Sequence, residues 1–298
     1  MKKSVLAAAT AAVLVASLAH AADDAKDWRA VGPDNLVLIG TKYGEVAVEL
    51  SPAFAPKHVE RMRALIRAHF FDGTNFYRVI EGFVAQGGVG EDTASTANKP
   101  VNPETLKKWP EMRAEFERPW GHDVQFTPSG SPDLFAKQTG HVDGFPVGRD
   151  PKKKTEWIIH CPGTFAFARD NAADTASTEF YIVIGEAPRR LDRNLTAFGR
   201  VLDGMQYVQK LNRGDPAVDN GVIADKAKQD RITYMKLASD MPEAERPHYD
   251  VMRTDSKAFA AWKKNKKNPA PGFYIRQPPP ILDICLAPVP VRKSAAKS

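Results

Sequence analysis

The chain has 298 residues, of which 43% are hydrophobic and 26% are charged, and its formal net charge at pH 7 is +6. These fractions are ordinary for a globular protein, and the length allows one enlarged domain or two small ones. Positive charge is too dispersed for a nucleic-acid surface, because Lys152–Lys154 and Lys263–Lys267 are short clusters that we interpret as solvated loops. We therefore expect no nucleic-acid partner.

Residues 1–21 have the pattern of a secretory signal peptide. Lys2-Lys3 form a charged start, Val5–Leu18 is a mostly apolar run, and Ala19-His20-Ala21 is a small-x-small cleavage site. A membrane anchor is the alternative, but the run is short for a bilayer span. We expect cleavage after Ala21, a periplasmic or secreted protein, and no stable membrane insertion.

The first elements follow a short polar segment. We interpret residues 22–34 as a leader. The runs Leu36–Ile39 and Glu45–Leu50 flank a turn and predict a hairpin. Val59–Ala68 has apolar residues at helical spacing, which predicts an amphipathic helix packed on a sheet.

The stretch Phe70–Gly88 carries the clearest chemical signal. After the turn at Asp72-Gly73, Phe76, Arg78 and Ile80 alternate with Tyr77 and Val79, which predicts a strand covered on both faces. A second short strand, Phe83–Gln86, follows. A guanidinium among aromatic side chains is costly unless its charge is used or paired, so Arg78 is a candidate functional residue. The alternative is a solvated arginine on a strand.

Residues 89–158 separate this stretch from the next apolar block. The part from Glu91 to Pro103 is polar, and residues 117–158 are rich in Gly, Pro, Asp and Lys. We interpret most of the segment as a surface insertion that either lines a cleft or binds a partner. Its His122 and His141 lack any metal-ligand spacing, so we expect surface histidines and no metal site.

The second half contains two further apolar blocks and then changes character. Gly163–Ile184 and Leu191–Val201 are followed by a predicted short helix, Met205 to Leu211, and a closing strand, Ile232–Leu237. Residues 240–298 are charged and Pro-rich and too short for a second core, so we expect an extension that wraps the first domain. Within it, Ile281–Leu286 could be one added strand, and Ser294–Ser298 a disordered end.

Cys161 and Cys285 are the two cysteines of the chain. An even count in an oxidising compartment predicts a disulfide, and one intramolecular pairing exists. The alternative is a catalytic Cys161 beside His160, which is weaker because neighbours in a strand point to opposite faces.

Three of these blocks resemble the signatures of cyclophilin-type peptidyl-prolyl cis–trans isomerases. The first family pattern is Phe-His-Arg-Val-Ile-x-Gly-Phe-x-x-Gln-Gly-Gly, and the chain matches it at Phe76, Arg78, Val79, Ile80, Gly82, Phe83, Gln86, Gly87 and Gly88. Gly163–Ile182 resembles the second block, which ends in Phe-Phe-Ile. Leu191–Val201 resembles the third, Leu-Asp-x-x-x-x-x-Phe-Gly-x-Val. The resemblance covers about residues 35–238.

The resemblance implies a mainly β fold: a closed antiparallel eight-stranded β-barrel capped by two helices, with a long insertion and a C-terminal extension. The predicted division is a signal peptide (1–21), an isomerase domain (22–239, with the insertion at about 89–158) and an extension (240–298).

The resemblance also implies an activity, peptidyl-prolyl cis–trans isomerisation, which would assist the folding of secreted or periplasmic proteins. Rotation about an Xaa-Pro bond is opposed by amide resonance, and an enzyme must bind the twisted amide better than the planar one. No bond to carbon breaks, so we expect no cofactor. The expected partners are proline-containing segments of unfolded or secreted proteins, and we expect a monomer.

Arg78 is the implied catalytic residue, a donor to the proline nitrogen of the twisted amide. The other residues implied in substrate binding or in support of the pocket are Phe76, Tyr77, Ile80, Phe83, Val84, Gln86, Ala168, Arg169, Glu179, Tyr181, Leu191 and Leu195.

Five positions depart from common family residues. Tyr77 and Leu195 each replace a His, Val84 replaces a Met, Glu179 replaces a Gln, and Arg190 replaces a Trp. A Glu179 carboxylate beside Arg78 would form a charge-assisted pair that either holds the guanidinium or competes with substrate for it. The change at Arg190 predicts weak cyclosporin binding.

Two alternatives to the isomerase remain. In the first, the domain is a catalytically weak module that binds proline segments or acts as a chaperone, because a fold does not guarantee an activity. In the second, it is a hydrolase with Ser177 or Cys161 as nucleophile, but no recognisable arrangement of His and acid accompanies either residue.

Overall fold

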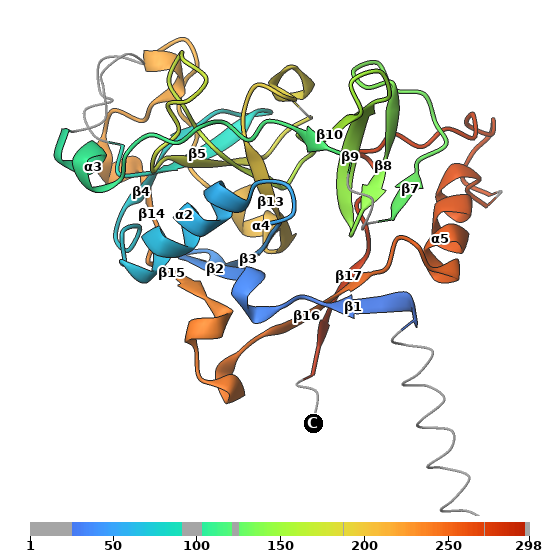
Figure 1. The fold of residues 1–298 in the computed structure, drawn as a ribbon, viewed down its shortest axis with the longest axis horizontal. Helices are drawn as coiled ribbons and strands as arrows, with labels where there is room; N and C mark the ends of the chain where they lie inside the picture. Colours follow the sequence, from blue (N-terminus) through green and yellow to red (C-terminus); the bar gives the residue numbers. More distant parts are fainter. Residues whose placement is uncertain (1–25, 91–102, 121–124, 187, 271, 296–298) are drawn as a thin grey trace, which may run out of the picture.

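The computed structural model describes residues 26–90, 103–120, 125–186, 188–270 and 272–295 (Figure 1). The predicted signal peptide, His122, nearly all of the polar segment from Glu91 to Pro103, and the last three residues lie outside the described residues. Within the described ranges, no helix has the length and apolar character needed to cross a bilayer.

The largest element of the fold is a nine-stranded antiparallel sheet that curls strongly on itself (Figure 1). In spatial order its strands are β14 (Asp230–Arg231), β4 (Asn75–Val79), β5 (Val84–Gly88), β12 (Phe180–Val183), β11 (Thr164–Phe167), β13 (Ala197–Asp203), β3 (Gly44–Leu50), β2 (Leu36–Thr41) and β15 (Tyr234–Leu237).

The predicted closed eight-stranded barrel is therefore wrong, although the mainly β class is confirmed. The described sheet has nine strands, and its edges, β14 and β15, do not pair with each other. Both edges come from one segment: Ile232 hydrogen-bonds to Thr74 beside β4, and Thr233 hydrogen-bonds to Gly40 of β2. The segment passes from one edge of the sheet to the other within two residues. Because the two edge strands do not pair, the sheet is an open half-barrel.

The predicted hairpin and first helix are confirmed. Both faces of the β2–β3 hairpin are buried: Val37 and Val48 lie in the inner core, whereas Leu38 and Ala47 lie in an outer cluster. This double burial explains the nearly continuous apolar run in β2.

Four α-helices occur in the described residues: α2 (Pro56–Arg67), α3 (Pro103–Lys108), α4 (Met205–Val208) and α5 (Lys257–Lys267). Helix α2 begins with proline at its first position and turns Val59, Met62, Leu65 and Ile66 into the inner core. Helix α4 ends earlier than predicted. Short 3₁₀ turns lie at Pro33–Asn35, Arg189–Leu191, Asp219–Gly221, Lys226–Lys228, Ala238–Asp240 and Glu243–Glu245.

A second sheet forms where mostly loop-like surface insertion was expected. Its order is β6 (Arg118–Pro119), β10 (Thr155–Ile158), β9 (Phe145–Asp150), β8 (Gln138–Val142) and β7 (Phe126–Pro128). The abundant glycine and proline of this segment are typical of loops, so its sequence did not predict these strands. Val142, Phe145, Val147 and Ile158 pack in one cluster with residues of β5 and β12, so this sheet shares a core with the main one. His141 is buried against Phe259, and the prediction of a surface histidine is wrong there.

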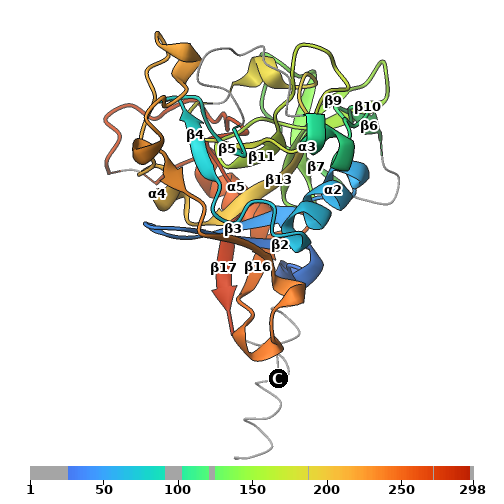
Figure 2. The ribbon, with the colours of Figure 1, turned by 90° about the vertical axis from the view of Figure 1, so that its left-hand side faces the viewer.

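A third sheet joins the two ends of the chain and lies beneath the main sheet (Figure 2). Its order is β1 (Trp28–Ala30), β16 (His248–Met252) and β17 (Val291–Ser294). The segment expected to be a leader therefore contributes a strand, and Ser294 ends a strand rather than beginning a disordered end.

The predicted strand Ile281–Leu286 is wrong: the segment is a turn. Prolines lie on both sides of it and cannot donate to a sheet ladder. Its backbone is instead held by Ser131, whose hydroxyl accepts from the Leu282 N–H.

Candidate active site

The candidate catalytic arginine lies on β4, where a bulge decides which way the side chains point. In the β4–β5 pairing Phe76 lies opposite Gly87 and Arg78 opposite Gln86, which makes Tyr77 an extra residue. Such a bulge breaks the alternation of a strand. Phe76 is therefore buried in the inner core, whereas Tyr77 and Arg78 both line a cleft. The expectation that Phe76 and Arg78 share one face is wrong.

This cleft has a volume of about 460 Å³ and gathers most of the predicted site residues. Those that line it are Tyr77, Arg78, Phe83, Val84, Gln86, Ala168, Arg169, Tyr181, Leu191 and Leu195. Three predicted residues lie outside the lining: Phe76 in the core, Ile80 against Gly221, and Glu179 behind Tyr77. Arg190 is exposed and also lies outside the lining.

Two neighbours hold the Arg78 guanidinium in place. Its Nε donates to the Asn220 carbonyl oxygen over 2.8 Å, and its Nη1 donates to Oε1 of Gln86 over 3.1 Å. The guanidinium carbon lies 6.0 Å from the centre of the Phe83 ring. Burial lowers the pKa of Arg78, but an arginine remains charged at neutral pH. The result is a fixed cation at the edge of the cleft.

A second layer of polar groups lies behind the arginine. Gln86 donates from Nε2 to the Tyr77 hydroxyl over 2.6 Å. Burial, and then the nearby Glu179 carboxyl, raise the pKa of Tyr77 well above its usual range, so the hydroxyl keeps its proton. Burial also raises the pKa of Glu179 to about 7, against the smaller effect of its contact with Tyr77.

The expected pair between Glu179 and Arg78 is absent from the described residues. Glu179 accepts instead from the Val89 N–H over 3.1 Å, and its carboxyl faces Tyr77, which stands between it and the arginine. Gln86 and the Asn220 carbonyl are instead the hydrogen-bond partners of the Arg78 side chain.

The opposite wall of the cleft is apolar. Val84 and Tyr181 belong to the cluster that joins the main sheet to the second sheet, and Phe83, Leu191 and Leu195 pack against it. The wall beyond them is fixed by Arg169, whose guanidinium donates to the carbonyl oxygens of Asp170, Asn171 and Asn194. The cleft thus combines the Arg78 guanidinium with an apolar surface.

Three lining residues, Asp219, Asn220 and Val222, were not predicted. Asp219 and Asn220 have positive φ angles of 47° and 52°, and Gly221 follows with 86°. The Asn-Gly pair marks a turn in the sequence, but the carbonyl that holds Arg78 lies 142 residues from it along the chain. Local patterns carry no information about such a contact.

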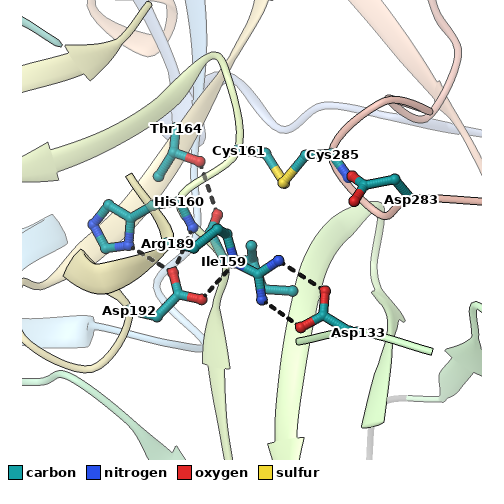
Figure 3. Close-up of a disulfide and its surroundings, with 9 residues drawn as sticks. All are labelled: Asp133, Ile159, His160, Cys161, Thr164, Arg189, Asp192, Asp283 and Cys285. Atoms are coloured by element: carbon teal, nitrogen blue, oxygen red, sulfur yellow. Dashed lines mark hydrogen bonds and ion pairs between the residues drawn. A yellow bond between two sulfur atoms is a disulfide. The ribbon is translucent and has the colours of Figure 1, made fainter. Parts of the chain in front are cut away.

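Cys161 and Cys285 form a disulfide, as the cysteine count indicated (Figure 3). It joins the start of the β11 block to the C-terminal segment. Neither cysteine is a free thiol, so the alternative of a catalytic Cys161 has no nucleophile in this state of the protein.

Comparison with known proteins identifies one family. The family model for cyclophilin type peptidyl-prolyl cis-trans isomerases matches residues 36–236. A probable peptidyl-prolyl cis-trans isomerase of Brucella suis is 28% identical over 207 residues, which are 67% of this chain and 82% of that protein. A peptidyl-prolyl cis-trans isomerase of Helicobacter pylori is 28% identical over 179 residues, covering 59% and 80% of the two chains.

The match to one solved structure extends beyond the residues of the family model. The crystal structure of cyclophilin AquaCyp293 from Hirschia baltica superposes with a TM-score of 0.71 at 28% identity, and the match covers 93% of this chain and 97% of that one. Since the family model spans two thirds of the sequence, the chain belongs to the cyclophilin-type peptidyl-prolyl cis–trans isomerase family.

Proposed function

We propose that this protein catalyses cis–trans isomerisation of Xaa-Pro bonds in the cleft beside β4, with Arg78 as the catalytic residue. The observation that carries the proposal is that the anchored Arg78 guanidinium and an apolar wall line one cleft. The apolar wall would hold the proline ring, and the cation would lie beside the amide that turns.

The chemistry needs no more than a difference in binding. The barrier to rotation about the amide is about 18–20 kcal/mol, and an enzyme lowers it by binding the twisted form more tightly than the planar one. Rotation removes amide resonance, so the proline nitrogen becomes pyramidal and accepts a hydrogen bond. A preorganised donor aimed at such a position is worth about 3–4 kcal/mol in comparable sites.

Arg78 suits this role because part of its guanidinium is already anchored. In the described part of the chain, Nε and Nη1 are the nitrogens that hydrogen-bond to protein, which leaves Nη2 for a ligand. Two anchors also reduce the entropy that the side chain loses when substrate binds.

The setting of this activity is a further part of the proposal. We propose a signal peptide at residues 1–21, an isomerase domain at 22–239 with its insertion at about 89–158, and an extension at 240–298. The clients would be proline-containing segments of secreted or periplasmic proteins. The disulfide supports an oxidising compartment. Detection of the processed protein in the cytoplasmic fraction alone would contradict this setting.

The test compares catalysed cis–trans exchange of an Ala-Pro peptide, measured by NMR, for wild type and Arg78→Ala. We expect kcat/KM to fall by about 10²–10³-fold, because one preorganised donor is lost. Arg253→Ala is the matched control: this arginine pairs with Asp255 at the surface and lies outside the cleft lining.

No exchange above the spontaneous rate, from wild-type protein shown to be folded, would overturn the proposal. If that protein still bound the peptide, the alternative of a proline-binding module would replace the isomerase. Cleavage of the peptide, detected by mass, would support the hydrolase instead.

A further inference from the structure

One residue that lines the cleft has its hydroxyl bonded to a buried histidine. Tyr181 lies on β12 and lines the cleft, but the residue is 3% exposed. The family pattern has a phenylalanine here. The hydroxyl of Tyr181 lies 2.8 Å from Nε2 of His160, and the two rings stack with 17° between their planes. The polar end of Tyr181 is therefore held beneath the pocket.

His160 is itself fixed on its other side. Its Nδ1 lies 3.1 Å from Oδ1 of Asp192, and the same oxygen accepts from the His160 backbone N–H over 2.9 Å. A carboxylate can only accept, so Nδ1 carries the proton. In the neutral ring Nε2 is then the acceptor, and the Tyr181 hydroxyl donates to it.

The carboxylate is anchored in turn by a chain of ion pairs (Figure 3). Arg189 donates from Nε to Asp192 over 2.8 Å, and its two other nitrogens bind the carboxylate of Asp133 over 2.8 and 2.9 Å. Asp133 belongs to the insertion. Although burial acts to raise the pKa of Asp192, the contacts with His160 and Arg189 lower it overall, so the group stays ionised.

We propose that His160 is a positioning residue for the isomerase: by holding the hydroxyl of Tyr181, it fixes the floor of the proline pocket. Asp192 and Arg189 set the orientation of its ring. The inference rests on the proposed function, since it concerns the same cleft. It gives the insertion a link to the pocket through Asp133.

The arrangement of Tyr181, His160 and Asp192 does not form a nucleophile for a hydrolase. The Tyr181 hydroxyl points to His160, beneath the cleft, and burial raises its pKa well above the usual range. A buried hydroxyl that has a partner stabilises the ring position, whereas one without a partner drives the ring to move toward water.

A double-mutant cycle tests the inference. In His160→Leu the hydroxyl loses its partner, and we expect kcat/KM for an Ala-Pro peptide to fall about tenfold, mainly through KM, as a buried unpaired hydroxyl predicts. Tyr181→Phe removes the hydroxyl and keeps the ring, so its own kcat/KM is the reference for the second arm of the cycle. The double variant leaves no hydroxyl unpaired, and its kcat/KM should return to within about twofold of Tyr181→Phe.

The return of activity in the double variant is a result that a purely structural role would not give. A purely structural His160 would lower the melting temperature in both backgrounds and leave the kcat/KM of folded protein unchanged. Wild-type kcat/KM in folded His160→Leu, or an equal loss when His160→Leu is added to Tyr181→Phe and to wild type, would overturn the inference.

Two further variants cover the case in which leucine prevents folding. His160→Gln can place an amide near Nε2, whereas His160→Asn is too short to reach Tyr181, so we expect the first to keep activity and the second to lose about tenfold. Equal activity in both would overturn the inference. His141→Leu is the control, since His141 is another buried histidine that lies outside the cleft lining.

An inactive wild type would refute the proposed function without deciding the role of His160. In that case the cycle is read from the dissociation constant of the Ala-Pro peptide, measured by NMR titration. An unchanged dissociation constant across all four proteins would overturn the inference on its own.

Discussion

The buried carboxyl of Glu179 links the stability of the folded protein to pH. Its carboxyl is buried behind Tyr77, and burial raises its pKa to about 7 from an ordinary value of 4.5. The folded state therefore binds a proton that the unfolded chain has already lost between those two values. Stability contributed by this group is present below about pH 4.5 and is lost as the pH rises toward 7.

Ionisation of Glu179 should make the free energy of unfolding depend on pH. Between pH 5 and 7.5 we expect the free energy of unfolding of wild type to fall relative to that of Glu179→Gln, by an amount on the order of 2 kcal/mol. The amide imitates the protonated carboxyl and cannot ionise. Urea denaturation at several pH values measures the difference.

Glu115→Gln is a control of opposite sign. Burial acts to raise the pKa of Glu115, but its hydrogen bonds with His58 lower it overall, so its contribution is lost as the pH falls below the ordinary value. A difference between wild type and Glu179→Gln that stays constant from pH 5 to 7.5 would contradict the prediction for Glu179.

At the scale of elements, the turn Asp219–Gly221 and strand β4 act together. The turn supplies the carbonyl that holds Arg78, and Val222 forms a bridge with Arg78 in the backbone. Gly221 has φ of 86°, and a Cβ atom there would overlap the side chain of Ile80. Both a left-handed conformation and a close approach therefore require glycine.

We expect Gly221→Ala to lower stability by about 1–2 kcal/mol through its conformation alone. Because the overlap with Ile80 also displaces the Asn220 carbonyl from Arg78, kcat/KM should fall about tenfold, as loss of one anchoring hydrogen bond predicts. Thermal denaturation and peptide exchange measure the two effects.

Gly82→Ala is the control, because it introduces backbone strain without an overlap that would displace the Asn220 carbonyl. Gly82 has φ of 68°, but no atom lies within 4 Å of a Cβ built there. The Gly82→Ala variant should lose as much stability as Gly221→Ala but keep most of its kcat/KM. An equal loss of kcat/KM in the two variants would show that the turn does not act through Arg78.

At the scale of the molecule, the three sheets are held together by groups from distant parts of the chain. Glu49 on β3 pairs with Arg29 on β1 and with Arg200 on β13, and Arg29 also pairs with Asp143 in the turn between β8 and β9. Glu49 is buried, so removal of either arginine would leave its charge partly uncompensated, whereas Asp143 is exposed. The disulfide adds a covalent link between the main sheet and the C-terminal segment.

Reduction of the disulfide should lower the stability of the whole protein. The bond joins residues 124 apart, and a loop of that size is worth up to about 5 kcal/mol in the chain-entropy model. We expect dithiothreitol to lower the urea midpoint of wild type, whereas Cys161→Ala/Cys285→Ala should start lower and not respond. An unchanged midpoint after reduction verified by mass would contradict this.

The sequence by itself determined the local elements and the family. Hairpin β2–β3, helix α2 and the block around Arg78 could be predicted because alternation, helical spacing and a long motif are properties of neighbouring residues. The family resemblance also identified most residues that line the cleft, since each block carries its own signature.

The tertiary structure alone decided the rest, for reasons of distance and context. The bulge at Tyr77 separates Phe76 from Arg78, and the anchors Asn220 and His160 lie far along the chain from the residues that they hold. The strands of the insertion contain glycine and proline, which obscure the alternation of a strand. Their apolar residues form a core by packing against the main sheet, and this contact is not a local property of the sequence. The order of strands in the open sheet also depended on long-range pairing, which no local pattern specifies.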